Sequence, residues 1–172
     1  MSHMSYVAPC LLVASPLLLD PNFLHTVVLI IEHSENGAMG VVLNRPIPIT
    51  VAQVCSENDM EYNGDPQSTA YFGGPVEPGR GIVLVRGDMP GPADTVLDFT
   101  DFVSQRKDLL KSLAKKPESM YRLFLGYSGW SAGQLERELE QNAWIRISLE
   151  PELLFLDDPT LLWRETVKTL LG

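Results

Sequence analysis

Residues 129–133, GWSAG, fit the pattern G-x-S-x-G, which presents a nucleophilic serine at the strand–turn–helix elbow of many hydrolases. Ser131 is therefore a candidate nucleophile. A serine hydroxyl needs a neighbouring general base, because it is a weak nucleophile at its own pKa. In the elbow enzymes the histidine follows the serine in the chain, and no histidine follows Ser131. A serine hydrolase that uses Ser131 is thus kept as an alternative interpretation.

The same stretch also fits a helix cap. Ser131 and Gln134 form the pattern S-x-x-Q of a capping box, in which each side chain bonds the backbone N–H of the other residue. Leu135 and Leu139 would then bury one face of the following helix. Loss of such a cap costs about 1 kcal/mol, which is reason enough for a serine here. We predict that Ser131 and Gln134 are structural capping residues, and we predict no catalytic residue.

Other sites for anions or metals find little support. The glycines at 126, 129 and 133 precede a helix, but the P-loop lysine is missing and glutamates follow at once. Residues 59–64 resemble the start of a calcium loop, yet its twelfth position, which should be a glutamate, is Ala70. The cysteines and histidines lack zinc spacing. We predict no metal and no cofactor.

One basic stripe is present. Lys107, Lys111 and Lys115 recur every four residues, and Arg106 and Lys116 lie beside them. A solvated helix face explains this pattern, since cations favour helix C-termini. A weak DNA-binding regulator that acts through the helix 106–116 is a further alternative. The chain shows neither a helix-turn-helix pair nor interleaved aromatic and basic residues.

Two polar or glycine-rich stretches do not fit a simple core. Asn44 and Arg45 end a buried strand, and Gly73-Gly74 lets backbone approach a neighbour closely. Close packing is one explanation, and a small pocket lined by Arg45 and the glycine backbone is the other. Trp130 is a large aromatic in a turn, between the glycines at 129 and 133, and we expect function there more than at the serine. The predicted ligand or partner surface comprises Asn44, Arg45, Gly73, Gly74, Trp130 and Gln134.

Composition limits the class of protein. The chain has 172 residues, 45% of them hydrophobic, which suits one domain with a buried core. Its net charge of −9 disfavours binding to nucleic acid or to anionic membranes. The apolar start at 10–19 lacks a preceding positive charge and contains Pro16, so it is neither signal peptide nor membrane span. Two cysteines in unlike contexts imply no disulfide framework. We predict a cytoplasmic protein without membrane contact.

The order of predicted elements indicates an α+β fold. Residues 1–3 match a tag remnant, and residues 4–172 form one domain. Short apolar runs predict strands at 11–14, 27–31, 40–43, 70–72, 82–85, 121–125 and 144–149. A short helix is expected at 50–55, a mobile loop at 56–68, and a hairpin turn at 77–80.

The clearest helical pattern follows Asp98. An apolar face at period 3.6 predicts one helix that Asp98 caps and that ends before Pro117. Asp158-Pro159 begins the last helix. The apolar face of the long helix comprises Phe99, Phe102, Val103, Leu109, Leu110 and Leu113.

Several stretches coincide, in order, with one known pattern. They are Leu12–Pro16 with Phe23, Gly37–Pro46, Gly73–Val76, Gly126–Trp130, Gly133–Glu136 with Glu138, Asn142–Trp144, and Leu154-Phe155 ahead of Trp163 and Gly172. On these residues the chain resembles the bacterial AlgH/YqgE family over essentially its whole native length. It departs at Leu84-Val85, where the family commonly has Leu-His, so a histidine has no role there.

The resemblance implies a fold and a broad role. The fold it implies is a compact α+β domain on a bifurcated sheet, part of it barrel-like, surrounded by helices. The family is largely uncharacterised, and its members often carry the label of transcriptional regulator. With a net charge of −9 and no DNA-reading motif, we expect regulation through an unknown small molecule or protein partner. The favoured function is therefore a non-enzymatic regulatory binding domain.

Overall fold

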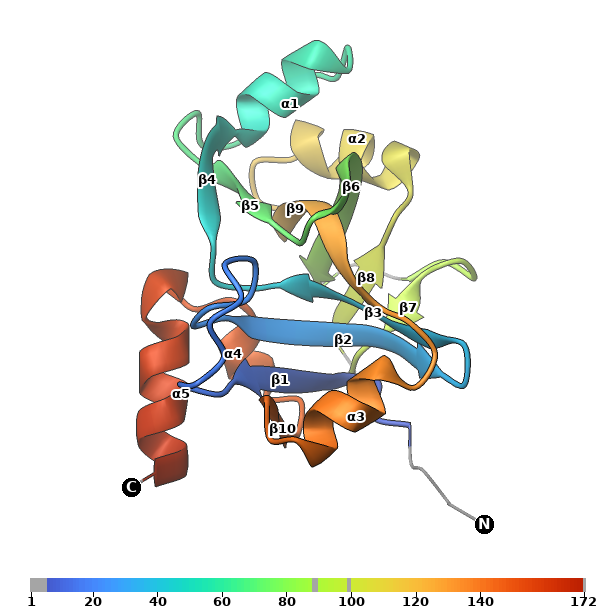
Figure 1. The fold of residues 1–172 in the computed structure, drawn as a ribbon. Coiled ribbons are helices and arrows are strands. Elements are labelled where there is room, and N and C mark those ends of the chain that lie inside the picture. The colour runs from blue at the N-terminus through green and yellow to red at the C-terminus, as the bar shows by residue number, and fades with distance from the viewer. Residues whose placement is uncertain (1–5, 88–89, 99, 172) are drawn as a thin grey trace.

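A computed structural model of the chain describes residues 6–87, 90–98 and 100–171. One mixed sheet runs through the molecule, with α1 and α2 at one end and α3 and α5 towards the other (Figure 1). The strands along it are, in spatial order, β10 (Trp144–Ile147), β1 (Cys10–Ala14), β2 (Val27–Ser34), β3 (Gly37–Val42), β9 (Met120–Trp130), β6 (Val76–Arg86), β8 (Asp101–Ser104) and β7 (Thr95–Val96). The α+β class predicted from the sequence is confirmed.

Strand β9 divides the sheet. Its last residues pair antiparallel with β3, while its middle pairs parallel with β5 (Thr69–Phe72), which also pairs with β4 (Pro46–Thr50). Strand β6 lies along the opposite edge of β9. The sheet is therefore bifurcated, as the resemblance implies. Within the described residues it is open from β10 to β7 and does not close into a barrel.

The chain crosses β9 between β5 and β6, and two glycines make the crossing possible. A Cβ on Gly73 would lie 2.2 Å from the carbonyl oxygen of Gly126, and one on Gly74 would lie 2.2 Å from the backbone of Tyr127. Both distances are far inside van der Waals contact. The glycine pair thus serves close chain packing, the first of the two explanations considered for it.

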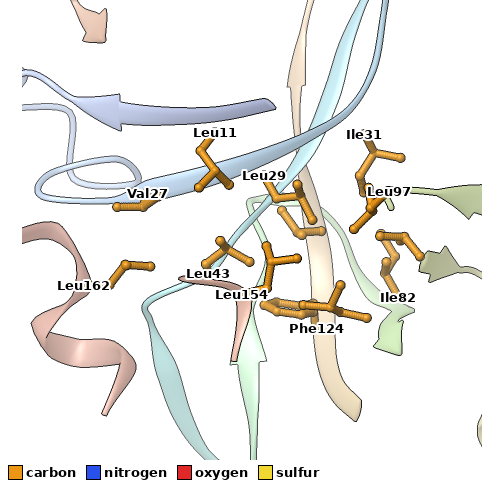
Figure 2. Packing of buried hydrophobic residues seen from close by; sticks show 13 residues of the cluster. Leu11, Val27, Leu29, Ile31, Leu43, Ile82, Leu97, Phe124, Leu154 and Leu162 are labelled. Carbon is orange, nitrogen blue, oxygen red and sulfur yellow. The ribbon is translucent and has the colours of Figure 1, made fainter. Parts of the chain in front are cut away.

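Both faces of β1 and β2 are buried. Leu11 and Leu29 point into one hydrophobic cluster, and Leu12 and Ile30 point into another on the opposite face. This explains why these strands are continuous apolar runs rather than alternating ones. Figure 2 shows the first cluster, in which side chains from β1, β2, β6 and β9 meet Leu154 and Leu162. The helices α4 (Pro151–Leu154) and α5 (Leu162–Leu171) supply the last two residues.

A third cluster fills the end of the molecule under α1 (Val51–Glu57) and α2 (Lys107–Lys115). The predicted helix at 50–55 is confirmed as α1. Thr50 and Gln53 form a complete capping box at its start, with the Gln53 N–H 3.0 Å from the Thr50 hydroxyl. The predicted start of the last helix is also confirmed, because Asp158 caps the turn η1 (Pro159–Leu161) that leads into α5.

The long helix predicted from Asp98 is wrong in its first half. Residues 101–104 form β8, and α2 begins only at Lys107. Phe102 and Val103 point to opposite faces, into different clusters, as strand residues do. Asp98 caps a turn instead, accepting the N–H of Thr100 at 2.9 Å and of Asp101 at 2.8 Å. Phe99 lies outside the described residues.

The hairpin turn predicted at 77–80 is also wrong. Val76 and Gly81 both pair with β9, so residues 77–80 are an irregularity within the single strand β6. The two strands expected to form the hairpin, β5 and β6, lie on opposite edges of β9.

Within the described residues no helix is long and apolar enough to cross a membrane.

Candidate functional site

The predicted capping box at Ser131 is only half formed. The Gln134 Oε1 accepts the Ser131 N–H at 2.9 Å, and the Ser131 hydroxyl lies 3.3 Å from the same oxygen. Helix α3 (Gln134–Glu140) begins after Gly133, its N-cap, which has φ 76° and supplies no side-chain cap. Ser131 therefore precedes the N-cap by two residues, and its hydroxyl contacts an amide rather than a base.

Trp130 and Gln134 belong to a polar cluster around one carboxylate. Trp130 and Trp144 donate their indole N–H groups to the same Glu138 oxygen, at 3.0 and 2.9 Å. Gln134 donates to the other oxygen at 2.8 Å. Phe23 stacks on Trp130 with ring centroids 5.9 Å apart. We call Trp130, Gln134, Glu138 and Trp144 the Glu138 cluster. It fastens α3 to β9 and β10.

Asn44 and Arg45 hold the connection between β1 and β2. The Asn44 side chain accepts the Val27 N–H at 3.0 Å and donates to the His25 carbonyl at 2.9 Å. Arg45 donates to three backbone carbonyls at 2.7–2.9 Å, those of Pro21, Asn22 and Leu24. This pair thus has structural hydrogen-bond partners of its own.

The structure places the predicted surface in three separate settings. Asn44 and Arg45 bind the β1–β2 connection, Gly73 and Gly74 pack on β9, and the rest lies in the Glu138 cluster. Arg45 does border a shallow hollow, but neither glycine contributes to its lining. The hollow is lined by Asn22, Asn44, Arg45, Pro46, Ile47, Phe72 and Thr160.

A more enclosed cleft lies at the end of α2. It has a volume of about 370 Å³ and is bounded by the segment 62–69, the C-terminus of α2 and the start of β9. Three tyrosines line it, and Lys116 and Asp65 lie at its exposed rim. We call this cavity the tyrosine cleft, after Tyr62, Tyr71 and Tyr121.

The segment that forms one wall of the cleft is fastened at several points. Asn63 bonds the end of α2 twice. Its N–H donates to the Ala114 carbonyl at 2.8 Å, and its side-chain amide donates to the backbone carbonyl of Lys115 at 2.8 Å. Tyr62 donates its hydroxyl to the Asp65 carbonyl at 2.7 Å. The loop expected to be mobile is thus tied to a helix, and it can form a preorganised wall.

The phenols of Tyr62 and Tyr121 remain protonated at neutral pH. Burial raises the pKa of Tyr121 well above its usual range, and burial is also the main cause of the raised pKa of Tyr62. Among the described residues the Tyr121 hydroxyl has no hydrogen-bond partner. None of their fully buried side-chain oxygens or nitrogens lacks a partner, so this hydroxyl keeps some exposure, and Tyr121 lines the cleft.

Sequence reasoning missed this cleft. Its tyrosines lie at 62, 71 and 121, on a loop and two strands, so no local motif joins them. The one local signal is the acidic stretch 59–64, which the sequence predicts as part of the loop 56–68 and as an incomplete calcium loop. Within the described residues no group of three or more His, Cys, Asp or Glu side chains could hold a metal.

The basic stripe lies on α2 as an exposed face. Lys107, Lys111 and Lys115 are exposed, as the periodicity indicated. Arg106 is the N-cap residue of the helix, and its guanidinium binds Asp94 at 2.8 Å and Asp108 at 3.2 Å. One of the five cations of the stripe is thus paired with carboxylates.

The fold defines an α+β domain on an open, bifurcated sheet, with a cleft beside one helix end. Residues 11–172 match the family model described as DUF179, AlgH-like, and the chain belongs to this AlgH-like family.

Individual relatives agree with this assignment. The UPF0301 protein IL2218 of Idiomarina loihiensis is 38% identical over 93% of this chain and 89% of its own length. The UPF0301 protein VV2869 of Vibrio vulnificus is 39% identical over 92% of this chain and 89% of its own. The solution structure of AlgH from Pseudomonas aeruginosa has a TM-score of 0.80 at 35% identity, covering 100% of this chain and 92% of that one. Protein DIP2367 of Corynebacterium diphtheriae shares the fold, with a TM-score of 0.74 at 24% identity over 98% and 90% of the two chains.

Proposed function

We propose that this chain is a non-enzymatic binding domain with a regulatory role in the cytoplasm, and that it binds a small polar molecule in the tyrosine cleft. The observation that carries the proposal is a preorganised cleft of about 370 Å³ with an unbonded tyrosine hydroxyl. Cavities of this size that combine aromatic walls with a few polar groups are typical ligand sites.

The lining of the cleft indicates the chemistry of the ligand. Tyrosine rings offer apolar faces, and their hydroxyls both donate and accept hydrogen bonds. Lys116 and Asp65 lie at the rim with opposite charges. Arg122 also lines the cleft, but its guanidinium donates to the Leu156 carbonyl and lies over the Tyr71 ring. We therefore expect a ligand with hydroxyl or amide groups, an apolar or planar face, and little net charge.

The contacts of Ser131 support binding rather than hydrolysis. Its side-chain partner among the described residues is Gln134, and an amide does not accept a proton at neutral pH. A nucleophilic serine needs a base within hydrogen-bond reach. Among the described residues, the hydrolase alternative therefore lacks a general base in contact with Ser131.

Charge supports a ligand other than nucleic acid. The chain carries −9 overall, and Arg106 of the basic stripe is bound to two carboxylates. Nucleic acid binds where several cations neutralise its phosphates, and the four lysines of the stripe stand against a net charge of −9. Two buried, free cysteines are consistent with the reducing cytoplasm.

Ligand-observed NMR against a defined panel tests the proposal. The panel comprises glucose, ribose, the common nucleosides, the neutral amino acids and inorganic phosphate as the anionic comparison. We expect at least one neutral member to bind, and Tyr121→Phe to weaken it roughly tenfold, the effect of one hydrogen bond. Tyr127→Phe is the matched control, because Tyr127 lines a different hollow with Gly129 and Trp130. No binding by any member, or equal binding by both variants, would contradict the proposal.

A further inference from the structure

The imidazole of His33 joins three parts of the molecule. Its Nδ1 accepts the backbone N–H of Val7 at 3.0 Å, and its Nε2 lies 3.0 Å from the Glu136 carboxylate of α3. The side chain is 1% exposed, and the ring of Tyr6 meets it edge-on at 5.1 Å. Both ring nitrogens are thus occupied inside the protein.

These two contacts select one tautomer of the neutral ring. A backbone N–H can only donate, so Nδ1 must carry its lone pair, and the ring hydrogen is then on Nε2, facing Glu136. An imidazolium carries hydrogens on both nitrogens. It would keep the contact with Glu136 and strengthen it by charge, but its Nδ1–H would oppose the Val7 N–H.

The charged group in contact with the ring is the Glu136 carboxylate. Burial alone would raise the pKa of Glu136, but hydrogen bonds from His33 and from its own backbone N–H outweigh burial and lower it. Glu136 is therefore a carboxylate at mildly acidic pH. Arg137 lies next to Glu136 on α3, Glu32 precedes His33 on β2, and the ring of Tyr6 contacts the imidazole edge-on.

We propose that His33 is an acid-sensitive latch for the segment 6–9. On protonation the ring keeps Glu136 and releases Val7, so this segment detaches while β2 and α3 remain in place. Val7 and Ala8 pack on the cluster that contains Cys10, Leu12 and Trp144, so release uncovers an apolar face there. The latch is independent of the tyrosine cleft and holds whether or not that cleft binds a ligand.

Two NMR signals in the unaltered chain test the latch. The pH is lowered from about 8 to about 5, the range in which histidines titrate, while the His33 ring signal and the Val7 amide are followed. We expect Val7 exchange protection, corrected for the intrinsic pH dependence of exchange, to fall about tenfold or more with the midpoint of the His33 ring. The amide of Leu29 in β2 should stay protected throughout.

Two variants complete the test. His33→Gln has no titrating ring, and its Val7 protection should not change between these pH values. His25→Gln removes a histidine that stacks on Trp163 at 3.9 Å, and it should keep the full response. The latch is overturned if the His33 ring titrates while Val7 stays protected, if Val7 is released with a different midpoint, or if the ring does not titrate above pH 5. Both signals come from the unaltered chain, so they still test the latch if the His33→Gln variant fails to fold.

Discussion

At the scale of single residues, the GWSAG turn has a structural role, although its pattern is that of a nucleophile elbow. The specific contacts of the turn are made by Trp130 rather than Ser131. Trp130, Trp144 and Gln134 all donate hydrogen bonds to the Glu138 carboxylate. An ionised carboxylate suits three donors, because both of its oxygens only accept. This arrangement accounts for the tryptophan in this glycine-rich turn without a ligand.

Replacement of the central carboxylate should destabilise the fold. Glu138→Gln keeps one accepting oxygen but turns an NH₂ group towards one of the three donors. We expect a loss of about 1–3 kcal/mol in the free energy of unfolding, measured by urea denaturation. Glu140→Gln removes the same charge from an exposed position of the same helix and should change stability by less than about 0.5 kcal/mol. Equal losses in both variants would mean that charge alone, and not the Glu138 cluster, is responsible.

At the scale of elements, two helix starts with the same sequence pattern differ in structure. Thr50 and Gln53 form a complete capping box, whereas Ser131 and Gln134 form only one of its two backbone bonds. Thr50→Ala should therefore cost about 1 kcal/mol of unfolding free energy, and Ser131→Ala less than about 0.5 kcal/mol. Thermal or urea denaturation of the two variants measures this difference. A larger loss at Ser131 would show that its hydroxyl caps α3 after all.

The crossing of β9 gives a second prediction at this scale. Gly74→Ala places a methyl group 2.2 Å from the Tyr127 backbone, which has little room to move within a sheet. We expect a loss of about 3 kcal/mol or more in stability, or failure to fold. Gly79→Ala is the control, because a Cβ there meets nothing within 4 Å. Circular dichroism and urea denaturation compare the two, and a stable Gly74→Ala protein would rule out the close crossing.

The sequence predicted most strands but not how they pair. Continuous apolar runs identify β1 and β2 because both of their faces are buried. Residues 102–103 fit the helical period of the following segment equally well, and their pairing with strands β6 and β7 makes them a strand. The Pro78-Gly79 turn signal is likewise local, whereas the partner of β6 is β9. Long-range pairing also explains why the tyrosine cleft could not be predicted.

At the scale of the whole molecule, the free energy of unfolding should decrease at acidic pH as the Asp94 carboxylate becomes protonated. Hydrogen bonds from Arg106 lower the pKa of its carboxyl to about 2, although burial opposes this. A lowered pKa stabilises the fold above the unfolded pKa of about 4, and this contribution is lost as the pH falls towards 2. We expect Asp94 to contribute roughly 1–2 kcal/mol of this loss, allowing for partial solvent screening.

Urea denaturation at several pH values measures that contribution. Asp94→Asn should be less stable at neutral pH and should lose less stability on acidification than the unaltered chain. Asp108→Asn is the comparison, since Asp108 is 79% exposed in its contact with Arg106 and should behave like the unaltered chain. An unchanged acid profile in Asp94→Asn would contradict the assigned role.

The whole molecule thus combines a sheet, a GWSAG turn with a structural role and a preorganised tyrosine cleft. The most direct test of this account is to locate a bound member of the neutral panel by intermolecular nuclear Overhauser effects. Binding in the tyrosine cleft predicts contacts from the ligand to the rings of Tyr62 and Tyr121. Contacts to Trp130 or Tyr127 instead, or covalent modification of Ser131, would contradict it.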